Sequence, residues 1–194
     1  MIMATYSKMK KSTFLIFILL LLAGALCALL LEGLFRGPGN PNELRITSFQ
    51  DWRLVCPAVQ SSDAGCSLAT DVVRDQGGSL VSLSLEDPAA GSKLSITVPH
   101  GVLLDPGLGF SVGNDPLRVR PYETCTQVGC FALVTVDADT LQSLMDNENG
   151  QVVVVPGNGS PVTIPFSLKG FSEGHAALEQ AFEQRNSFWS YLGR

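Results

Sequence analysis

Four cysteines in two close pairs are the residues of this sequence that are best suited to chemistry. They form two close pairs, Cys56 with Cys66 and Cys125 with Cys130, separated by nine and four residues. Zinc sites usually space their cysteines as C-x2–4-C or include nearby histidines, and a redox dithiol needs C-x-x-C at a helix start. Only the Cys125–Cys130 spacing falls within the zinc range, both histidines are far from it in sequence, and no C-x-x-C is present. We therefore expect structural disulfides, and of the three pairings that four cysteines allow, the spacing favours Cys56–Cys66 with Cys125–Cys130.

Two histidines, His100 and His175, are the remaining candidates for acid–base catalysis. Neither has a Ser, Cys or Asp at a spacing that suggests a triad, so we expect both to be surface residues. Asp137 and Asp139 form a D-x-D pair, but no third oxygen donor completes a calcium loop. The sequence therefore predicts no catalytic residue, metal site or cofactor, and an enzyme or redox protein remains only as a third hypothesis.

An uncharged apolar run occupies residues 14–31. As an α-helix it would be about 27 Å long, close to the thickness of a bilayer's hydrocarbon core. Lys8, Lys10 and Lys11 precede the run, and basic residues before a span hold that end in the cytoplasm. We therefore expect a single-pass anchor in a bacterial inner membrane, with the N-terminus cytoplasmic and the C-terminal domain periplasmic.

Two other interpretations of the apolar run stay open. Ala23-Gly24-Ala25 has the small-x-small form of a signal-peptide cleavage site, although six more apolar residues follow it. Cys27 could carry a lipid, but the bulky Leu26 stands where lipid-modified cysteines are normally preceded by a small residue. The length of the run favours an anchor that is not cleaved.

The charge balance excludes one class of partner for the rest of the chain. The net charge is −5, from 13 Lys and Arg against 18 Asp and Glu, and four of the basic residues precede residue 37. A domain with this excess of negative charge would repel the phosphates of nucleic acid and is a poor partner for it. The predicted segments are a cytoplasmic N-terminus (1–12), a transmembrane anchor (13–35), a Gly- and Pro-rich linker (36–44), a β-sandwich (45–178) and a C-terminal helical and aromatic tail (179–194).

Short segments of alternating apolar and polar residues dominate the predicted domain. The segment 79–85, SLVSLSL, is typical of a strand with one buried face. Seven or eight such segments with few helices favour an antiparallel β-sandwich. The predicted strands are 51–56, 67–73, 79–85, 93–98, 117–122, 131–136, 151–155 and 162–166.

Two short helices complete the prediction. Asp139 is expected to cap a helix over residues 140–145, and a last helix is expected from about Glu173. Four large side chains follow in the tail, and we expect them to contact a partner or the bilayer surface, since Trp and Tyr are enriched in both settings. Docking of the tail on its own sandwich is the alternative. These residues are Phe188, Trp189, Tyr191 and Leu192.

Five landmarks in order give the chain a family resemblance. They are DWRLVC at 51–56, a second cysteine at 66, PHGVLL at 99–104, a Tyr-x-x-Cys-x4-Cys-x-Ala segment at 122–132, and VTIPFSLKGF at 162–171. Together they resemble the bacterial invasion-associated locus B family over residues 49–178. The resemblance implies a small extracytoplasmic β-sandwich of immunoglobulin-like outline, with two disulfides and no known catalytic site.

The sequence departs from that family in two ways. Most members carry a cleavable signal peptide, whereas residues 14–31 favour a retained anchor. The aromatic tail beyond Leu178 is also additional. These departures favour a non-enzymatic, membrane-anchored periplasmic interaction domain, most specifically an accessory subunit of an envelope or inner-membrane protein complex. The alternative, which the family name alone supports, is a secreted or surface virulence or adhesion factor that assists host-cell invasion.

Overall fold

The computed structural model describes residues 21, 44–57, 65–73, 77–89 and 91–192, without the side chains of residues 188–192. The chain divides into two compact units, Met1–Pro41 and Asn42–Arg194. The predicted cytoplasmic segment 1–12 and, apart from Leu21, the predicted anchor 13–35 lie outside the described residues. No helix in the part of the chain that the structure describes is long and apolar enough to cross a membrane.

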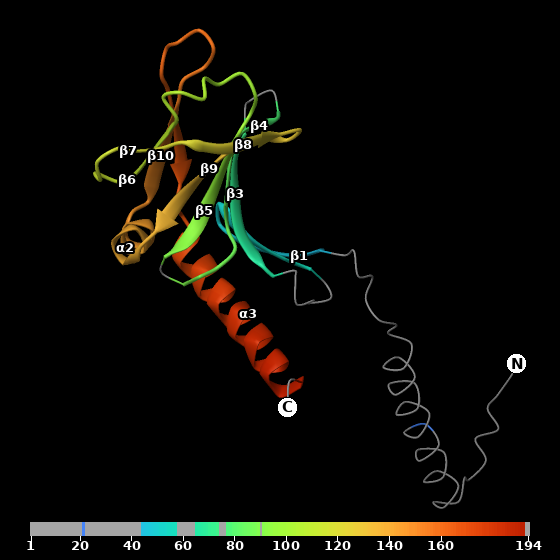
Figure 1. Ribbon diagram of the computed structural model, residues 1–194. Coiled ribbons are helices and arrows are strands. Elements are labelled where there is room, and N and C mark those ends of the chain that lie inside the picture. The colour runs from blue at the N-terminus through green and yellow to red at the C-terminus, as the bar shows by residue number, and fades with distance from the viewer. Residues whose placement is uncertain (1–20, 22–43, 58–64, 74–76, 90, 193–194) are drawn as a thin grey trace, which may run out of the picture. The chain divides into compact units, whose positions relative to one another are not determined.

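Seven strands of the second unit form one antiparallel sheet, called here the large sheet (Figure 1). They are β1 (Leu44–Phe49), β2 (Trp52–Pro57), β3 (Ser67–Val73), β4 (Ser79–Leu85), β5 (Ser92–Val98), β8 (Tyr122–Thr126) and β9 (Gly129–Val136). Their order is β1-β2-β3-β4-β5-β9-β8, so the chain first runs as a meander and later adds β9 and β8 beside β5. The β1–β2 hairpin turns through Gln50 and Asp51 alone, with Gln50 at a left-handed φ of 52°.

Alternation in the sequence places one face of the large sheet in the core. Val81, Leu83 and Leu85 of β4 are fully buried, and the serines between them are half-buried on the opposite face. Trp52 and Leu54 continue the buried face into β2. Successive side chains of a strand point to opposite faces, and each fully buried Leu or Val stabilises the fold by about 1.5–3 kcal/mol.

Four further strands form the small sheet, which packs against the buried face of the large sheet. They are β6 (Leu108–Val112), β7 (Arg118–Arg120), β10 (Asn149–Val154) and β11 (Val162–Ser167), in the order β11-β10-β6-β7. Phe110 and Phe166 stack across β10 with ring centroids 5.9 Å apart. Gly150 lies between them in the sheet, and a Cβ there would fall 2.3 Å from the Phe166 ring. Helix α2 (Ala138–Asp146) joins β9 to β10 and buries Leu144.

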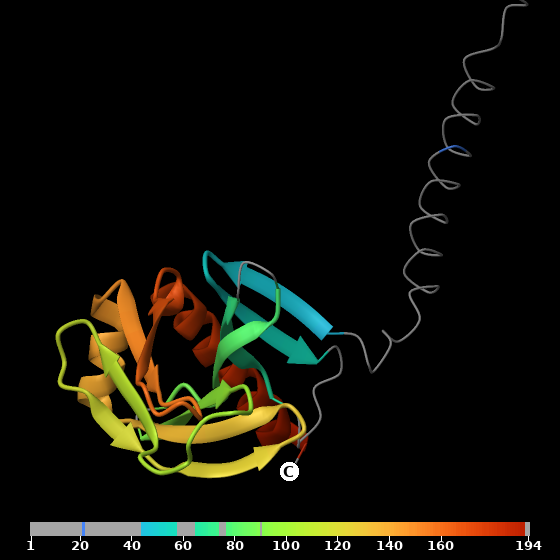
Figure 2. The same cartoon turned by 90° about the horizontal axis from the view of Figure 1, so that it is seen from above.

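Helix α3 (Phe171–Leu192) follows β11 and covers the β1, β2 and β3 end of the large sheet. In Figure 2 it lies between β10 and β11 of the small sheet (orange) and the β1–β2 hairpin (cyan). One face of the large sheet is thus covered partly by the small sheet and partly by α3. In the described part of the second unit the fold is mainly β, with antiparallel sheets and the two helices α2 and α3. The division into seven and four strands differs from the four-plus-three division of a constant-type immunoglobulin domain.

Several boundaries differ from the sequence prediction for physical reasons. The predicted strand 117–122 is two strands, β7 and β8, which belong to different sheets because Pro121 lacks an N–H and ends the pairing of β7. β6 was not among the predicted strands. At Gly109 a Cβ would fall 3.1 Å from Val153, a tight contact that a small residue avoids.

The remaining corrections concern β1 and the helices. β1 (Leu44–Phe49) was not among the predicted strands, and its first residue was placed in the linker. The cap of α2 is Asp137, whose carboxylate accepts the Thr140 N–H at 2.8 Å, and Asp139 lies in the first turn instead. The last helix was predicted to be short and to begin at about Glu173, whereas α3 begins at Phe171 and is 22 residues long.

Candidate functional site

Two distant segments of the sequence meet where α3 begins. The Trp52 indole Nε1–H donates a hydrogen bond to the Ser167 carbonyl at 3.0 Å. Its ring also meets the Phe171 ring edge to face, with centroids 5.0 Å apart. The backbone N–H of Asp51 donates to the Lys169 carbonyl at 3.2 Å. These contacts fix the β1–β2 hairpin to the start of α3, and they explain why Trp52 is 1% exposed.

Two glycines allow α3 to approach the large sheet closely. Gly170 adopts φ 86°, and a Cβ on it would fall 1.9 Å from the Phe49 carbonyl oxygen. One turn into the helix, a Cβ on Gly174 would fall 2.5 Å from Leu68. A side chain at Gly170 would therefore collide with the β1 backbone, and one at Gly174 would displace the Leu68 side chain or the helix.

His175 is a buried residue of this interface, so the prediction that it lies on the surface was wrong. It is 2% exposed, and its Nε2 lies 2.9 Å from the Pro88 carbonyl oxygen. Its Nδ1 lies 4.0 Å from a carboxylate oxygen of Glu179, one turn along the helix. The sequence missed this role because the Pro88 turn is distant in sequence. His175 therefore connects α3 to the turn that follows β4.

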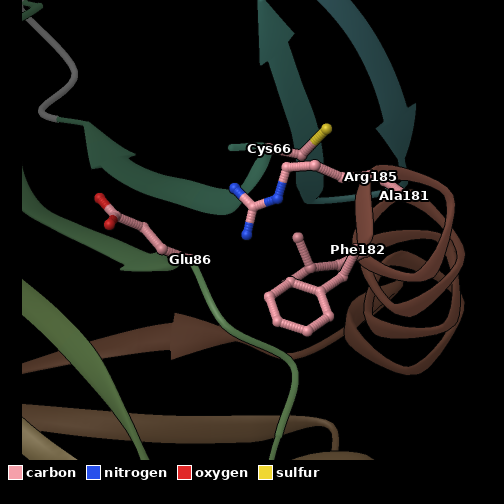
Figure 3. A pocket seen from close by; sticks show the side chains of 6 residues that line it. Cys66, Glu86, Ala181, Phe182 and Arg185 are labelled. Atoms are coloured by element: carbon pink, nitrogen blue, oxygen red, sulfur yellow. The ribbon is translucent and has the colours of Figure 1, made fainter. Parts of the chain in front are cut away.

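The C-terminal half of α3 borders an open cleft, called here the α3 cleft (Figure 3). Its volume is about 390 Å³, and a narrow extension reaches Leu178 and Ala181. Phe182 and Arg185 form the helical wall, while the ends of β3 and β4 form the opposite wall. The cleft is lined by Gly65, Cys66, Ser67, Glu86, Asp87, Phe182 and Arg185.

Charges of both signs face the α3 cleft. The Arg185 guanidinium lies 5.0 Å from the centre of the Phe182 ring, a cation–π contact. It also lies against Gly65, where a Cβ would fall 2.5 Å from Nη1. Figure 3 shows Arg185 and Glu86 on opposite walls. Among the described residues, neither Glu86 nor Arg185 forms an ion pair.

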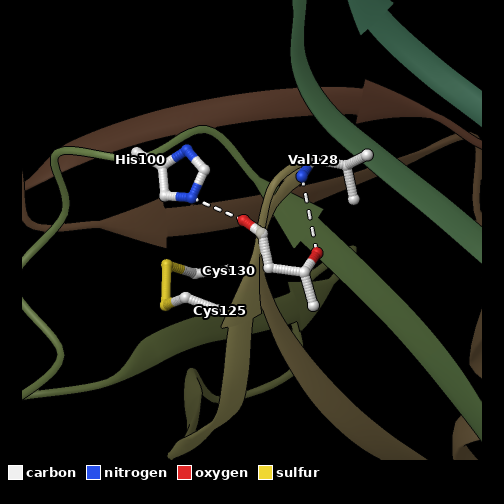
Figure 4. Close-up of a disulfide and its surroundings, with 5 residues drawn as sticks. His100, Cys125, Val128 and Cys130 are labelled. Carbon is white, nitrogen blue, oxygen red and sulfur yellow. Dashed lines mark hydrogen bonds between the residues drawn. A yellow bond between two sulfur atoms is a disulfide. The ribbon is translucent and has the colours of Figure 1, made fainter.

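The described cysteines form two disulfides with the local pairing that the spacing favoured. Cys56 bonds to Cys66 between the ends of β2 and β3, with Cα atoms 4.2 Å apart, and Cys66 lines the α3 cleft. Cys125 bonds to Cys130 across β8 and β9, with Cα atoms 3.9 Å apart. Figure 4 shows the second bond with His100 nearby. His100 is exposed as predicted, and its Nε2 lies 2.6 Å from the Thr126 carbonyl oxygen.

A second, smaller pocket opens between the ends of the two sheets. Its volume is about 180 Å³ and its lining is mostly apolar. Residues 99–102 of the PHGVLL segment form one side, and Leu104 at the end of that segment is 58% exposed. The pocket is lined by Leu80, Val98, Pro99, His100, Gly101, Val102, Val154, Pro156, Val162 and Ile164. His100 is hydrogen-bonded to a backbone carbonyl, and no nucleophile lies among these lining residues. The pocket therefore presents a mostly apolar surface to a ligand.

The polar residues singled out in the sequence have structural roles. Within the described ranges, no three His, Cys, Asp or Glu residues come close enough to hold a metal ion. Asp137 accepts hydrogen bonds from the Thr140 hydroxyl and backbone N–H, which hold the pKa of its carboxyl below its usual range. Burial alone would raise the pKa of Asp71, but hydrogen bonds from Ser82 and Arg53 and the Arg53 charge outweigh it and lower that pKa.

Comparison with known proteins now identifies the family. The family model described as "Invasion associated locus B (IalB) protein" matches residues 52–179. The chain belongs to the invasion-associated locus B family. Two "Invasion protein B homolog" proteins from Brucella abortus, one from strain 2308 and one from biovar 1 strain 9-941, are each 29% identical over 146 residues, covering 74% of this chain and 82% of theirs.

A solved structure supports the fold of this invasion-associated locus B protein. The crystal structure of invasion associated protein b from Bartonella henselae superposes with a TM-score of 0.64 at 19% identity. It covers 72% of this chain and 98% of the Bartonella chain. The family match begins at Trp52 and ends at Glu179, so it includes the junction of Trp52 with α3. It leaves out β1 and the C-terminal part of α3.

The predicted contact residues lie in this last part of the invasion-associated locus B chain. The backbone of residues 188–192 continues α3 to Leu192. The side chains of Phe188, Trp189, Tyr191 and Leu192 lie outside the described residues. Their role as a contact surface stays a prediction.

Proposed function

We propose that this chain is a non-enzymatic interaction domain on the periplasmic side of a bacterial inner membrane. The apolar run 14–31 would hold it there, and the C-terminal part of α3 with the α3 cleft would bind another envelope protein. In its most specific form, the proposal is that the chain is an accessory subunit of an inner-membrane complex. The two disulfides agree with an oxidising compartment. The family is not known for enzymatic activity.

One observation carries the proposal: α3 is longer than its packing against the sheets requires. Phe171, His175 and Leu178 are buried, but the side chains from Glu179 to Ser187 are exposed or half-buried. Figure 1 shows its C-terminal end (red) running away from both sheets. Isolated helical turns are marginal in water, so a helix that extends past its own core is well suited to packing on a second protein.

The half-buried side of this helix supplies a continuous candidate surface. Ala181, Phe182 and Arg185 recur at three- and four-residue steps and border the α3 cleft. Trp189 lies four residues beyond Arg185 on the same helical stripe. Helices that dock in a partner's groove place their anchors at these spacings. The positive and negative charges of the cleft would orient the bound protein on this apolar surface.

Co-purification from detergent-solubilised membranes tests the proposal. We expect the full chain to retain a specific envelope protein and a chain lacking residues 187–194 to lose it. The melting temperature should be unchanged, because the deleted residues lie beyond the buried part of α3. Trp189→Ala should weaken retention of that protein, whereas Gln184→Ala, which changes an exposed side chain on another side of the helix, should not. A truncated chain that melts earlier but keeps its partner would contradict the proposal.

The names of the Brucella relatives support a second candidate function, a secreted or surface factor that assists host-cell invasion. The two functions differ in location. An accessory subunit stays in the membrane fraction, and a secreted factor is recovered from the medium. Fractionation followed by mass determination of the mature chain separates them.

A further inference from the structure

The strand β1 ends the large sheet, and no described strand pairs with its outer edge. It is also the most exposed strand among those described, because five of its six residues are exposed and Phe49 is half-buried. Leu44 and Ile46 are 58% and 59% exposed. An unpaired edge carries backbone N–H and C=O groups that are ready to pair with another strand.

The other sheet edges in the described part of the chain are protected against such pairing. β11 contains Pro165, which has no N–H to donate. β7 has three residues, two of them arginines. β8 carries Glu123 and an irregularity of register between Tyr122 and Thr124. β1 has no proline and no bulge, and it pairs with β2 in continuous register over all six residues.

We propose that β1 is a dimerisation edge, on which β1 of a second copy of this chain pairs antiparallel across a two-fold axis at Ile46. This surface lies outside the family match at 52–179 and is independent of the proposed contact surface on α3. The two large sheets would then form one continuous sheet.

The register follows from the hairpin. Because Phe49 and Trp52 close a two-residue turn, they form a hydrogen-bonded pair, and pairing to β2 recurs at every second residue of β1. The backbone groups of Leu44, Ile46 and Ser48 therefore point to the free edge. In a dimer centred on Ile46, Ile46 would pair with itself and Leu44 with Ser48 of the second copy.

The side chains of β1 are complementary to themselves in this arrangement. Ile46 lies beside Val55 in the hairpin, and both side chains are on the face of the large sheet that points away from the core. The two-fold axis would bring two such Ile–Val pairs together into one apolar cluster. Arg45, the one charged residue of β1, would lie opposite Thr47 rather than another charge. A second copy therefore satisfies the edge without placing two charges directly opposite each other.

Single added cysteines in the full chain test the register, in a Cys27→Ser background that removes the fifth cysteine of the sequence. Directly opposed residues of an antiparallel hydrogen-bonded pair have Cα atoms about 5.5 Å apart, within the range of a disulfide. We therefore expect Ile46→Cys to cross-link to itself under mild oxidation. Ser48→Cys is its matched control, because Ser48 is exposed on the same face but would lie about 13 Å from its own copy. A mixture of Leu44→Cys and Ser48→Cys chains should cross-link to each other.

The mass of the purified full chain, measured by light scattering in detergent, is the second test. We expect a dimer that Ile46→Lys converts to a monomer, whereas Val73→Lys, a change at an exposed residue of β3, should leave the dimer intact. Unchanged melting temperatures would show that the variants fold. A monomeric parent chain, equal cross-linking of Ile46→Cys and Ser48→Cys, or capture of a different protein by Ile46→Cys would each overturn the proposal.

Discussion

The indole N–H of Trp52 donates a hydrogen bond to the backbone carbonyl of Ser167, a residue 115 positions further along the chain. This contact joins the first strand of the family match to its last strand. Phe171 packs edge to face against the same indole ring. The two ends of the family pattern, DWRLVC and SLKGF, therefore form one structural junction.

Replacing Trp52 tests this junction. Trp52→Ala should lower the free energy of unfolding by about 3–5 kcal/mol, because it leaves a large cavity beside Phe171. Trp52→Phe keeps an aromatic ring and loses the donor to Ser167, so it should cost less. Chemical denaturation of the oxidised chain measures both. Val119→Ala, at a residue that is 57% exposed, is the control and should change stability by less than about 0.5 kcal/mol. Wild-type stability of Trp52→Ala would refute the assignment of Trp52 to the core.

Two glycines with similar backbone angles should respond differently to alanine. Gly170 and Gly159 have φ of 86° and 81°. A Cβ at Gly170 would meet the Phe49 carbonyl oxygen, whereas at Gly159 nothing lies within 4 Å. Gly159→Ala should therefore cost only the strain of the left-handed conformation, about 1 kcal/mol. Gly170→Ala should lower the free energy of unfolding by clearly more than this, as measured by thermal unfolding of both variants. Equal losses would show that the close approach to Phe49 is not maintained in solution.

The Arg53–Asp71 pair predicts a specific dependence of stability on pH. The pKa of Asp71 in the folded chain lies below its ordinary value of 3.8, so the unfolded chain binds the proton more tightly. The stabilisation is fully present above that ordinary value and is lost as the pH falls through the lower folded-state pKa. For a partly exposed pair it should be less than about 1 kcal/mol.

Acid unfolding curves of Asp71→Asn measure this contribution. The variant should be less stable than the parent chain at neutral pH, and the difference should shrink in acid. Asp105→Asn changes an exposed residue whose carboxylate has no hydrogen bond or ion pair among the described residues, so it should leave the curve unchanged. A difference for Asp71→Asn that stays constant down to about pH 2 would contradict the linkage.

The anchor should remain on the mature protein. The apolar run 14–31 is longer than the 7–15 residues of a typical signal-peptide core. Intact mass or N-terminal sequencing of the chain purified from membranes should therefore show residues 14–31 still attached. A mature chain that starts between Ala25 and Gly37 would instead favour cleavage.

The sequence by itself determined most of the strands and the pairing of the described cysteines. Strand residues alternate between buried and exposed faces, so the pattern of 67–73 and 79–85 predicted β3 and β4 with the bounds that the structure has. The disulfides join cysteines close in sequence, and such loops close readily. Both are local properties, which a linear pattern carries.

Tertiary structure decided which elements share a sheet and which polar residues are buried. β7 and β8 follow one another in sequence but pair in different sheets, because their partners β6 and β9 come from distant segments. His175 is buried because its partner, the Pro88 carbonyl, is 87 residues away in sequence. The α3 cleft likewise combines residues of β3, the turn after β4 and α3. Such contacts depend on how the layers pack, and local periodicity holds no information about that packing.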